Sequence, residues 1–399
     1  RLQLKRGPKF AGVPLPKALI PGGPYNTSVQ RAALRRLAQG MVATGAEGPG
    51  RYRALRDLLL GAPPRVAGLA AGAALQGAHL DIDTAWPIVS GLDQSTVLVQ
   101  GPPGAGKTWL GTRLIVRLMR AGRTVGVTAL SHRAIHNLLH EVEAVADAEG
   151  FTFAGLKKCS GDAGPDDETA FHSKLAQPRI ATIRENPDAV PAGVALLAGT
   201  AWLFSRPEFD GALDYLFIDE AGQVSLADAL AVGTSAKNLV LLGDPQQLPQ
   251  VSQATHPEGA GASVLVHVLG EHLTIPPERG LFLEQTWRMH PAVCAFISEL
   301  AYGMRLVSAP GREHQRVDSP GLSGVGLRYL PAAHAGNSQR ALEEAEIIAH
   351  EVTQLVGGRF TDAEGATHEF GLEHILVVTP YNAQVQALLA ALPPGAQVG

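Results

Sequence analysis

The chain has 399 residues, of which 45% are hydrophobic, and it carries a formal net charge of −4 at pH 7. This length predicts two or three domains, and the charge excludes a protein coated with basic surface, so any nucleic-acid contact is confined to a local groove. Two cysteines, Cys159 and Cys294, exclude a disulfide framework, and no apolar run has the length of a membrane span, which makes the cytoplasm the expected location.

Residues 1–77 are predicted to be a linker and a helical segment from an upstream domain. Prolines and glycines crowd residues 1–24, and the chain begins with Arg1 rather than Met, so we expect an excerpt of a longer polypeptide. Helical patterns follow at 28–41 and 51–60. Their arginines are expected on solvated helix faces, with nucleic-acid contact as the less favoured alternative. These are Arg31, Arg35, Arg36, Arg51, Arg53 and Arg56.

A first α/β domain is predicted for residues 78–275. Short apolar runs alternate with helical patterns, as is typical of strands covered on both faces. We therefore expect a parallel sheet flanked by helices. The apolar rhythm weakens between 150 and 191, where we expect an insertion or a long excursion. The expected strands are 96–100, 124–129, 194–200, 215–219 and 239–243.

A second α/β domain is predicted for residues 276–399. Its expected strands are too few for a complete sheet, so we expect a domain that is cut short. The expected strands are 281–283, 327–330 and 375–379, and the expected helices are 338–355 and 382–392.

Residues 101–108 fit the pattern of a phosphate-binding loop between a strand and an amphipathic helix. A chance match in a glycine-rich chain is the alternative, but the strand before the loop and the helix after it make that the weaker interpretation. The buried side of the expected helix is Leu110, Leu114, Ile115 and Leu118. The predicted nucleotide-binding residues are Gly101, Pro102, Pro103, Gly104, Ala105, Gly106, Lys107, Thr108 and Trp109.

Four of the expected side chains carry charge or bind metal near the phosphates. Lys107 is expected to reach the β and γ phosphates, and Thr108 to bind Mg²⁺. Asp219 and Glu220 end the strand expected at 215–219. There Asp219 is expected to hold Mg²⁺ and Glu220 to polarise the attacking water. Such pairs at strand ends are common, so this prediction depends on the phosphate loop upstream.

Two further residues are expected at the same place. Gln247 follows the strand at 239–243 and is expected to position the hydrolytic water, although a surface turn bounded by prolines explains it equally simply. Arg288 follows the strand at 281–283 and is expected to reach across an interdomain cleft toward the transferred phosphoryl group.

Polar residues after two other strands suit contacts to the phosphates of a single strand, with a tryptophan that can stack on a base. Helix capping explains Ser131 equally well. The predicted nucleic-acid contacts are Ser131, His132, Arg133, Asn137, Thr200 and Trp202.

Taken in order, these stretches resemble superfamily 1 helicases, in the group that includes the nonsense-mediated-decay helicase and the nuclease-linked replication helicases. The matching stretches are 101–108 (motif I), 128–137 (motif Ia), 219–223 (motif II), 243–249 (motif III), 285–291 (motif IV) and 378–384. The resemblance implies two RecA-like domains, the second truncated here, with ATP and Mg²⁺ between them and single-stranded nucleic acid across both. It also implies that Tyr381 stacks on adenine, that movement is 5′ to 3′, and that a RecB-like nuclease domain precedes this region.

The sequence departs from that group in two ways. The glutamine that usually reads adenine before motif I is not evident, and motifs V and VI are missing because the sequence stops first. This stretch alone is therefore expected to bind nucleotide but to hydrolyse it poorly.

The leading hypothesis is an ATP-driven motor on single-stranded nucleic acid, with DNA favoured over RNA. A P-loop phosphotransferase or GTPase without strand separation is one alternative. A non-catalytic, nucleotide-gated nucleic-acid-binding module is the other.

Overall fold

The computed structural model describes residues 25–77, 80–164, 166–248 and 259–399. Residues 1–24, which we predicted to be a linker, lie outside these ranges, as does Pro249 at the end of the segment 243–249.

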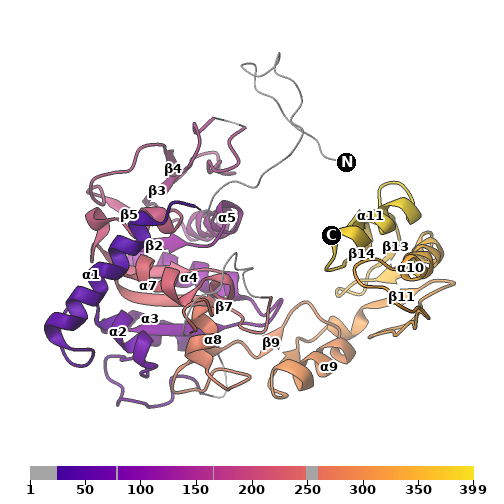
Figure 1. Cartoon of the computed structure of the whole chain (residues 1–399), viewed down its shortest axis with the longest axis horizontal. Coiled ribbons are helices and arrows are strands. Elements are labelled where there is room, and N and C mark those ends of the chain that lie inside the picture. The colour runs from indigo at the N-terminus through magenta and orange to yellow at the C-terminus, as the bar shows by residue number, and fades with distance from the viewer. Residues whose placement is uncertain (1–24, 78–79, 165, 249–258) are drawn as a thin grey trace.

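Within the described residues, eight parallel strands form one sheet (Figure 1). They are β1 (Thr96–Gln100), β2 (Val125–Thr128), β3 (Ala154–Lys158), β4 (Ile180–Ile183), β5 (Val194–Ala198), β6 (Leu213–Ile218), β7 (Ala236–Gly243) and β8 (Gly280–Phe282). Their order across the sheet is β4-β3-β5-β2-β6-β7-β1-β8. Val97 and Val99 of β1 pack in one buried cluster and Leu98 in another. Both faces are therefore covered, which explains why the central strands are continuous apolar runs.

Helices cover the two faces. They are α1 (Ser28–Thr44), α2 (Arg53–Leu60), α3 (Ile82–Ser90), α4 (Lys107–Arg120), α5 (His132–Ala148), α6 (Ala201–Phe204), α7 (Leu226–Gly233) and α8 (Val264–Leu269). Residues of α3, α4 and α5 join the cluster that contains Val97, and residues of α1, α2, α6, α7 and α8 join the cluster that contains Leu98. The parallel sheet, its five expected strands and the helices after Gly106 and before Gly61 are thus confirmed.

The segment 150–191 is not a separate insertion. It supplies β3 and β4, which pair with each other and extend the sheet beyond β5. The sequence analysis missed them because Ala154–Lys158 contains Gly155 and two lysines, although Lys157 is fully buried in the fold.

The helices α1 and α2 pack on this sheet, rather than on an upstream domain as we predicted. Leu37 and Leu55 belong to the same buried cluster as Leu98. Arg56 is fully buried and donates to Gly45 O (3.0 Å) and Gly48 O (2.8 Å), so the expectation of a solvated arginine is wrong there. It holds for Arg31 and Arg35, which are exposed.

The strand β8 also belongs to the first sheet, because Leu98, Val99 and Gln100 of β1 pair with Gly280–Phe282. The sheet therefore continues past residue 275, where we predicted the second domain to begin. A three-residue apolar strand carries no signal for the sheet that it joins, so only the fold decides this.

The remaining residues form a smaller unit with its own core of Ala345, Val352, Ala387, Leu388 and Leu392. A connecting segment, residues 283–308, precedes it and contains β9 (Gln285–Thr286), α9 (Pro291–Ala301) and β10 (Val307–Ser308). The smaller unit itself contains β11 (Arg316–Asp318), α10 (Leu342–Leu355), β12 (Arg359–Thr361), β13 (Thr367–Glu369), β14 (Leu376–Val377), α11 (Asn382–Ala391) and β15 (Gln397–Val398). Single 3₁₀ turns lie at Pro207–Phe209 and Ala221–Gln223 in the larger unit, and at Arg312–His314 and Leu372–His374 in the smaller one.

Three expectations for the smaller unit need correction. No strand forms at 327–330, where Tyr329 is 88% exposed. The strand expected at 375–379 covers only Leu376–Val377, and Leu376 is 65% exposed rather than buried. The helix expected from residue 338 begins at Leu342.

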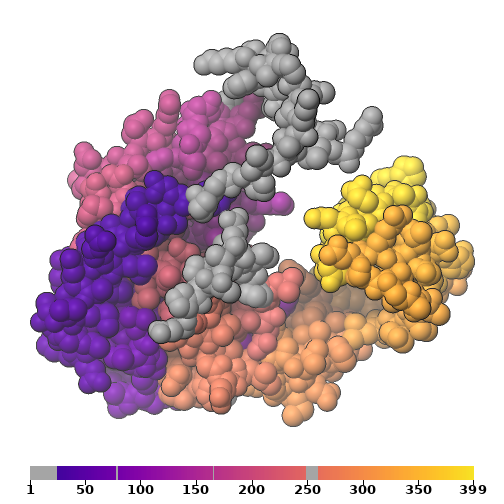
Figure 2. Space-filling view, viewed as in Figure 1, coloured from indigo at the N-terminus to yellow at the C-terminus, as the bar shows by residue number. Residues whose placement is uncertain are grey.

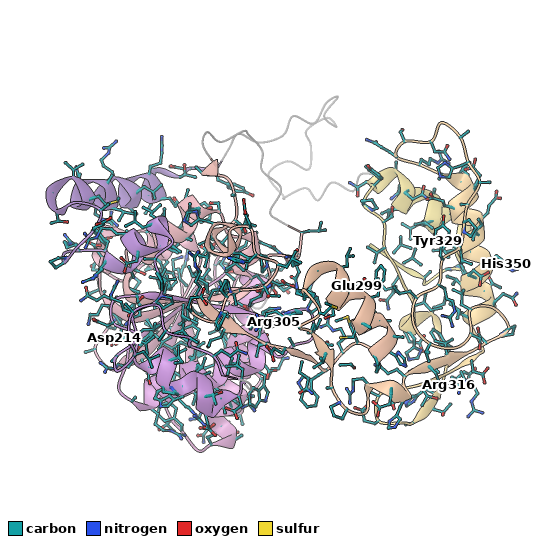
Figure 3. All side chains as sticks on the ribbon, turned by 90° about the horizontal axis from the view of Figure 1, so that it is seen from below. Asp214, Glu299, Arg305, Arg316, Tyr329 and His350 are labelled. Atoms are coloured by element: carbon teal, nitrogen blue, oxygen red, sulfur yellow. The ribbon has the colours of Figure 1, made fainter. Side chains whose placement is uncertain are left out.

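The connecting segment is fastened to the larger unit. Arg305 donates to Thr274 Oγ1 (3.1 Å) and forms an ion pair with Glu284 (2.9 Å). Figure 3 shows Arg305 beside the larger unit and Tyr329 in the smaller one. In the face shown in Figure 2, open space separates the yellow end of the smaller unit from the larger unit. Among the helices of the described part, none is both long and apolar enough to cross a bilayer.

Arg56→Ala is expected to lower the free energy of unfolding by about 3 kcal/mol, because it removes two hydrogen bonds and leaves a cavity under the α1–α2 connection. Arg35→Ala, on the exposed side of α1, is the control and should change it by less than about 0.5 kcal/mol. Urea denaturation measures both, and equal losses would contradict a structural role for Arg56.

Candidate functional site

The loop between β1 and α4 has the backbone that a phosphate cradle requires. Gly104 and Gly106 have φ of +74° and +88°, a conformation that other residues adopt at a cost. A Cβ at Gly101 would lie 2.3 Å from Lys107 Cγ, so glycine there lets the lysine fold back over the loop. Lys107 Nζ donates to Gly101 O at 2.6 Å. The ammonium group is thus held against the loop at the start of α4, and the N-terminal end of a helix suits an anion.

Four polar segments meet at this edge of the sheet. The strands β6, β7, β1 and β8 are neighbours and parallel, so their carboxyl ends lie side by side. Asp219 follows β6, Asp244 follows β7, the phosphate loop follows β1, and Glu284 to Arg288 follow β8. Backbone bonds hold the ends together, since Gly101 N donates to Gly243 O (3.0 Å) and Leu283 N to Gln100 O (2.9 Å).

The carboxylate of Asp219 is buried beside the loop, with 7% exposure. Burial and the neighbouring Glu220 raise its pKa to about 6, while the charge of Lys107 acts in the opposite direction. A buried carboxylate whose ionised form is this poorly stabilised fits a divalent cation, and Thr108 lies in the first turn of α4. Glu220 has φ of +50°, and its N–H donates to Asp219 Oδ1 (3.0 Å), so the chain turns sharply between the two acids.

The segment after β7 touches the segment after β6. A Cβ at Gly222 would lie 2.6 Å from Asp244 O, which shows how closely the two backbones approach. Gln247 is half-buried in this segment, and its N–H donates to Asp244 O at 3.3 Å. The sequence analysis did not select Asp244, which is 1% exposed and close enough to Lys107 for its charge to favour the ionised carboxyl. Its position directly after a buried strand, like that of Asp219, was an available signal.

Arg288 lies against the phosphate loop, but it arrives from the first sheet and not across an interdomain cleft as we expected. Thr286 Oγ1 donates to Pro103 O (3.0 Å), and Trp287 N donates to Gly104 O (2.9 Å). A Cβ at Gly104 would lie 2.4 Å from Arg288 Cβ. The backbone of Arg288 is thus placed directly against the loop by its own neighbours.

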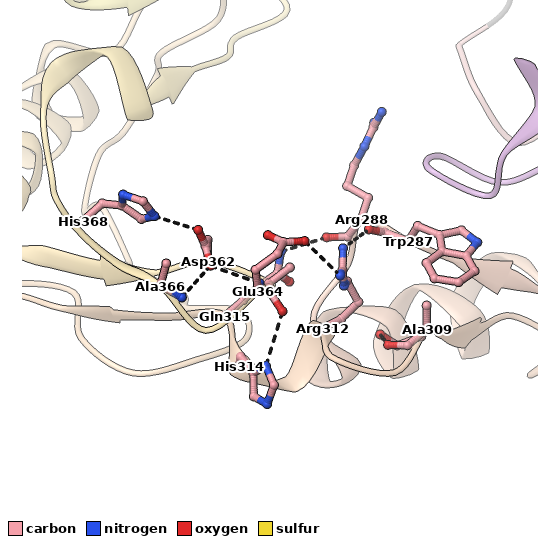
Figure 4. A network of polar contacts seen from close by, with 12 residues as sticks. Trp287, Arg288, Ala309, Arg312, His314, Gln315, Asp362, Glu364, Ala366 and His368 are labelled. Carbon is pink, nitrogen blue, oxygen red and sulfur yellow. Dashed lines mark hydrogen bonds and ion pairs between the residues drawn. The ribbon is translucent and has the colours of Figure 1, made fainter. Parts of the chain in front are cut away.

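The same segment is held from its other side by the smaller unit. Figure 4 shows the contacts, in which Arg312 donates to Trp287 O (2.9 Å) and Gln315 donates to Arg288 O (3.2 Å). Arg312 also forms an ion pair with Glu364 (3.3 Å). Residues 286–288 therefore link the phosphate loop to the smaller unit.

Two of the residues expected to bind the nucleotide, Trp109 and Tyr381, are about half exposed. Trp109 is 49% exposed, and the Arg113 guanidinium lies 4.0 Å from the centre of its ring. Tyr381 is 46% exposed at the start of α11 in the smaller unit, and none of its described contacts reaches the phosphate loop.

The residues expected to bind single-stranded nucleic acid follow β2 and β5, which are adjacent strands of the sheet. Arg133 and Asn137 are exposed on α5, and Thr200 precedes α6. Trp202 is 43% exposed, and its Nε1 donates to Asn26 O (2.9 Å). Ser131 accepts a hydrogen bond from Ala134 N (3.1 Å), as a helix cap does.

His132 has a defined protonation state. Its Nδ1 lies 2.6 Å from Lys157 Nζ and its Nε2 lies 3.1 Å from Ser160 Oγ. Burial and the charge of Lys157 lower its pKa to about 4. His132 is therefore neutral at pH 7 and offers hydrogen bonds rather than charge.

Comparisons with known proteins agree with this arrangement. Two models described as "AAA domain" match residues 88–258 and residues 261–396. The chain is 25% identical over 320 residues to the DNA replication ATP-dependent helicase/nuclease JHS1 of Arabidopsis thaliana, covering 74% of this chain and 22% of that protein. It is 28% identical over 260 residues to the Regulator of nonsense transcripts 1 homolog of Drosophila melanogaster, covering 57% of this chain and 21% of that protein.

Among solved structures, an arterivirus nonstructural protein 10 helicase with DNA aligns with a TM-score of 0.34 at 18% identity, over 54% of this chain and 42% of that one. This chain spans about a fifth of the length of the two curated relatives.

The parallel sheet with a phosphate loop after β1 and acidic residues after β6 defines a P-loop nucleoside triphosphatase fold. Within that class, the two AAA-domain matches and the helicase relatives support a superfamily 1 helicase, in the group of the nonsense-mediated-decay helicase and the replication helicase/nucleases.

Gly104→Ala is expected to weaken nucleotide binding by more than about tenfold, because the new Cβ must both adopt a positive φ and displace Arg288. Gly122 is a matched control, since it has the same φ of +74° with nothing within 4 Å of a built Cβ. Gly122→Ala should leave affinity unchanged. Fluorescent-nucleotide titration measures both, and equal affinities would show that the contact with Arg288 is unimportant.

Asp219→Asn is expected to raise the free energy of unfolding at pH 8 by on the order of 2 kcal/mol, without nucleotide or Mg²⁺. Its folded pKa of about 6 lies above the ordinary value of 3.8, so the ionised carboxyl opposes folding above pH 6. The gain should shrink as the pH falls from about 7 toward 4.

Asp214 is the control for this prediction. Burial raises its pKa, but the hydrogen bond from Thr124 N and the ion pair with Lys237 outweigh burial and lower it overall. Asp214→Asn should therefore destabilise the protein at pH 8. Denaturant titrations at several pH values that gave both variants the same sign would refute the assignment.

Proposed function

We propose that this chain is the motor region of an ATP-driven translocase or helicase that acts on single-stranded nucleic acid. The proposal rests on one observation. Four chain segments, which contain Lys107, Asp219, Gln247 and Arg288, follow four adjacent parallel strands and therefore lie at the same edge of the sheet. Phosphoryl transfer depends on positioning and charge rather than on covalent chemistry, and this edge offers both.

Each residue has a separate task in this proposal. Lys107 binds the β and γ phosphates, and Thr108 and Asp219 would hold Mg²⁺, which neutralises phosphate charge when bound. Glu220 accepts the proton of the attacking water. Gln247 positions that water, and Arg288 stabilises the charge of the transition state.

The proposed path of the nucleic acid follows the ends of β2 and β5. Arg133 and Asn137 would bind the backbone, and Trp202 would stack on a base. We favour DNA over RNA, because relatives of this chain are named DNA replication helicase/nucleases. By the same comparison we propose an upstream nuclease domain in the full-length protein. From the resemblance of the motifs we propose that Tyr381 stacks on adenine and that movement is 5′ to 3′.

We also propose a cytoplasmic location. Cys159 and Cys294 are both free and buried, as is usual in a reducing compartment.

Lys107→Ala and Glu220→Gln are each expected to lower ATP turnover by the full-length protein by about 100-fold or more. The first should also weaken ATP binding, because it removes a phosphate contact, and the second should retain it. Steady-state ATPase assays and nucleotide titration separate these effects. Equal loss of ATP affinity in both variants would contradict the role given to Glu220.

The motor function itself is tested by adding single-stranded DNA or RNA to the full-length protein. We expect ATP hydrolysis to rise and partial duplexes with 5′ tails to be unwound. Hydrolysis that ignores single strands would favour a phosphotransferase or GTPase. A cellular role that survives Lys107→Ala would favour a non-catalytic binding module.

A further inference from the structure

We propose that Tyr302 is a positioning residue for ATP hydrolysis, because its hydroxyl holds the buried Asp244 carboxylate in place beside Lys107. This inference rests on the proposed ATPase function and adds to it Tyr302, which lies outside the sequence motifs, and Asp244, to which the sequence analysis gave no role.

The contact itself is short and shielded. Tyr302 Oη donates to Asp244 Oδ2 at 2.6 Å, with side chains 3% and 1% exposed. The other oxygen of the carboxylate, Oδ1, accepts from Gln246 N (3.2 Å). The ring of Tyr302 packs near Phe282 of β8, with centroids 6.2 Å apart. Both oxygens are thus fixed, and a hydrogen bond to a buried charged group is among the stronger ones in proteins.

The Asp244 carboxylate is buried, and burial disfavours its ionised form. Burial raises the pKa of Asp244, while the hydroxyl of Tyr302, the N–H of Gln246 and the charge of Lys107 all favour the ionised form. In water-excluded surroundings a fixed negative charge acts strongly on a neighbouring ammonium. Asp244 therefore helps to hold Lys107 in the loop, where it donates to Gly101 O. Without the hydroxyl, Oδ2 of the carboxylate loses its 2.6 Å hydrogen bond.

Tyr302 also connects this charge to Arg288. The helix α9 begins three residues after Arg288 and ends immediately before Tyr302. At one end, Trp287 N donates to Gly104 O of the phosphate loop, and at the other, Tyr302 donates to Asp244. Eleven residues of helix span about 16 Å and behave as a rigid rod. A change at the Arg288 segment is thereby transmitted to the carboxylate beside Lys107.

The simpler interpretation is that Tyr302 only fills the core, and Tyr215 allows the two to be separated. Tyr215 is also 3% exposed, and its hydroxyl also makes a hydrogen bond, to Ser90 O at 3.2 Å. That acceptor is a neutral carbonyl, and Tyr215 belongs to the other buried cluster of the sheet. Removing either hydroxyl therefore changes a similar amount of buried structure, but only one of them contacts a charge beside Lys107.

The test uses four variants of the full-length protein, namely Tyr302→Phe, Tyr215→Phe, Asp244→Asn and the double variant of Tyr302 and Asp244. ATPase assays with saturating single-stranded DNA give kcat and KM for ATP, and thermal unfolding confirms folding. We expect Tyr302→Phe to lower kcat by about tenfold with KM changed by less than about twofold. Asp244→Asn should lower kcat at least as much, and adding Tyr302→Phe to it should cause no further loss.

Tyr215→Phe should retain the wild-type kcat. If Tyr302→Phe keeps the same kcat as Tyr215→Phe while the wild type hydrolyses ATP normally, the inference is overturned and the proposed function stands. Independent, multiplying losses in the double variant would also overturn it. A wild-type protein without strand-stimulated hydrolysis would instead refute the proposed function.

Discussion

The parallel pairing of β6, β7, β1 and β8 is the constraint on which the rest of this structure depends. Parallel strands end on the same edge, so residues such as Pro103 and Thr286, 183 positions apart in the chain, lie next to one another there. The apolar side chains on both faces of these strands keep the register, because a shift by one residue would turn a buried face outward. The chemistry at the edge therefore depends on a core that takes no part in it.

A second consequence concerns the segment after β8. Thr286 and Trp287 bind the backbone of the phosphate loop, and Tyr302 binds Asp244 beside Lys107. Arg312 and Gln315 hold the same segment from the side of the smaller unit. One stretch of chain thus contacts the nucleotide-binding loop and the second unit together. This arrangement suits a motor, in which the state of the phosphates must alter the relation between two units.

Some features lay beyond sequence reasoning for identifiable reasons. The strand Ala154–Lys158 contains lysines, and the burial of Lys157 depends on a histidine partner contributed by α5. Arg56 is buried because backbone carbonyls at Gly45 and Gly48 accept its hydrogen bonds. Asp244 follows a buried strand, as Asp219 does, but its partner Tyr302 lies 58 positions away and only the fold brings the two together. Each case is a polar side chain whose partner lies outside its own helix, strand or turn.

The sequence by itself determined the phosphate loop, the central strands, the acidic pair after β6 and the helicase family. Those signals are local, because glycine conformation, strand apolarity and motif spacing are all properties of short stretches. Only the tertiary structure decided that β3, β4 and β8 complete one sheet, that α1 and α2 cover it, and that Tyr302 meets Asp244. These depend on which buried surfaces and unpaired polar groups find each other when the chain folds, and no short stretch carries that information.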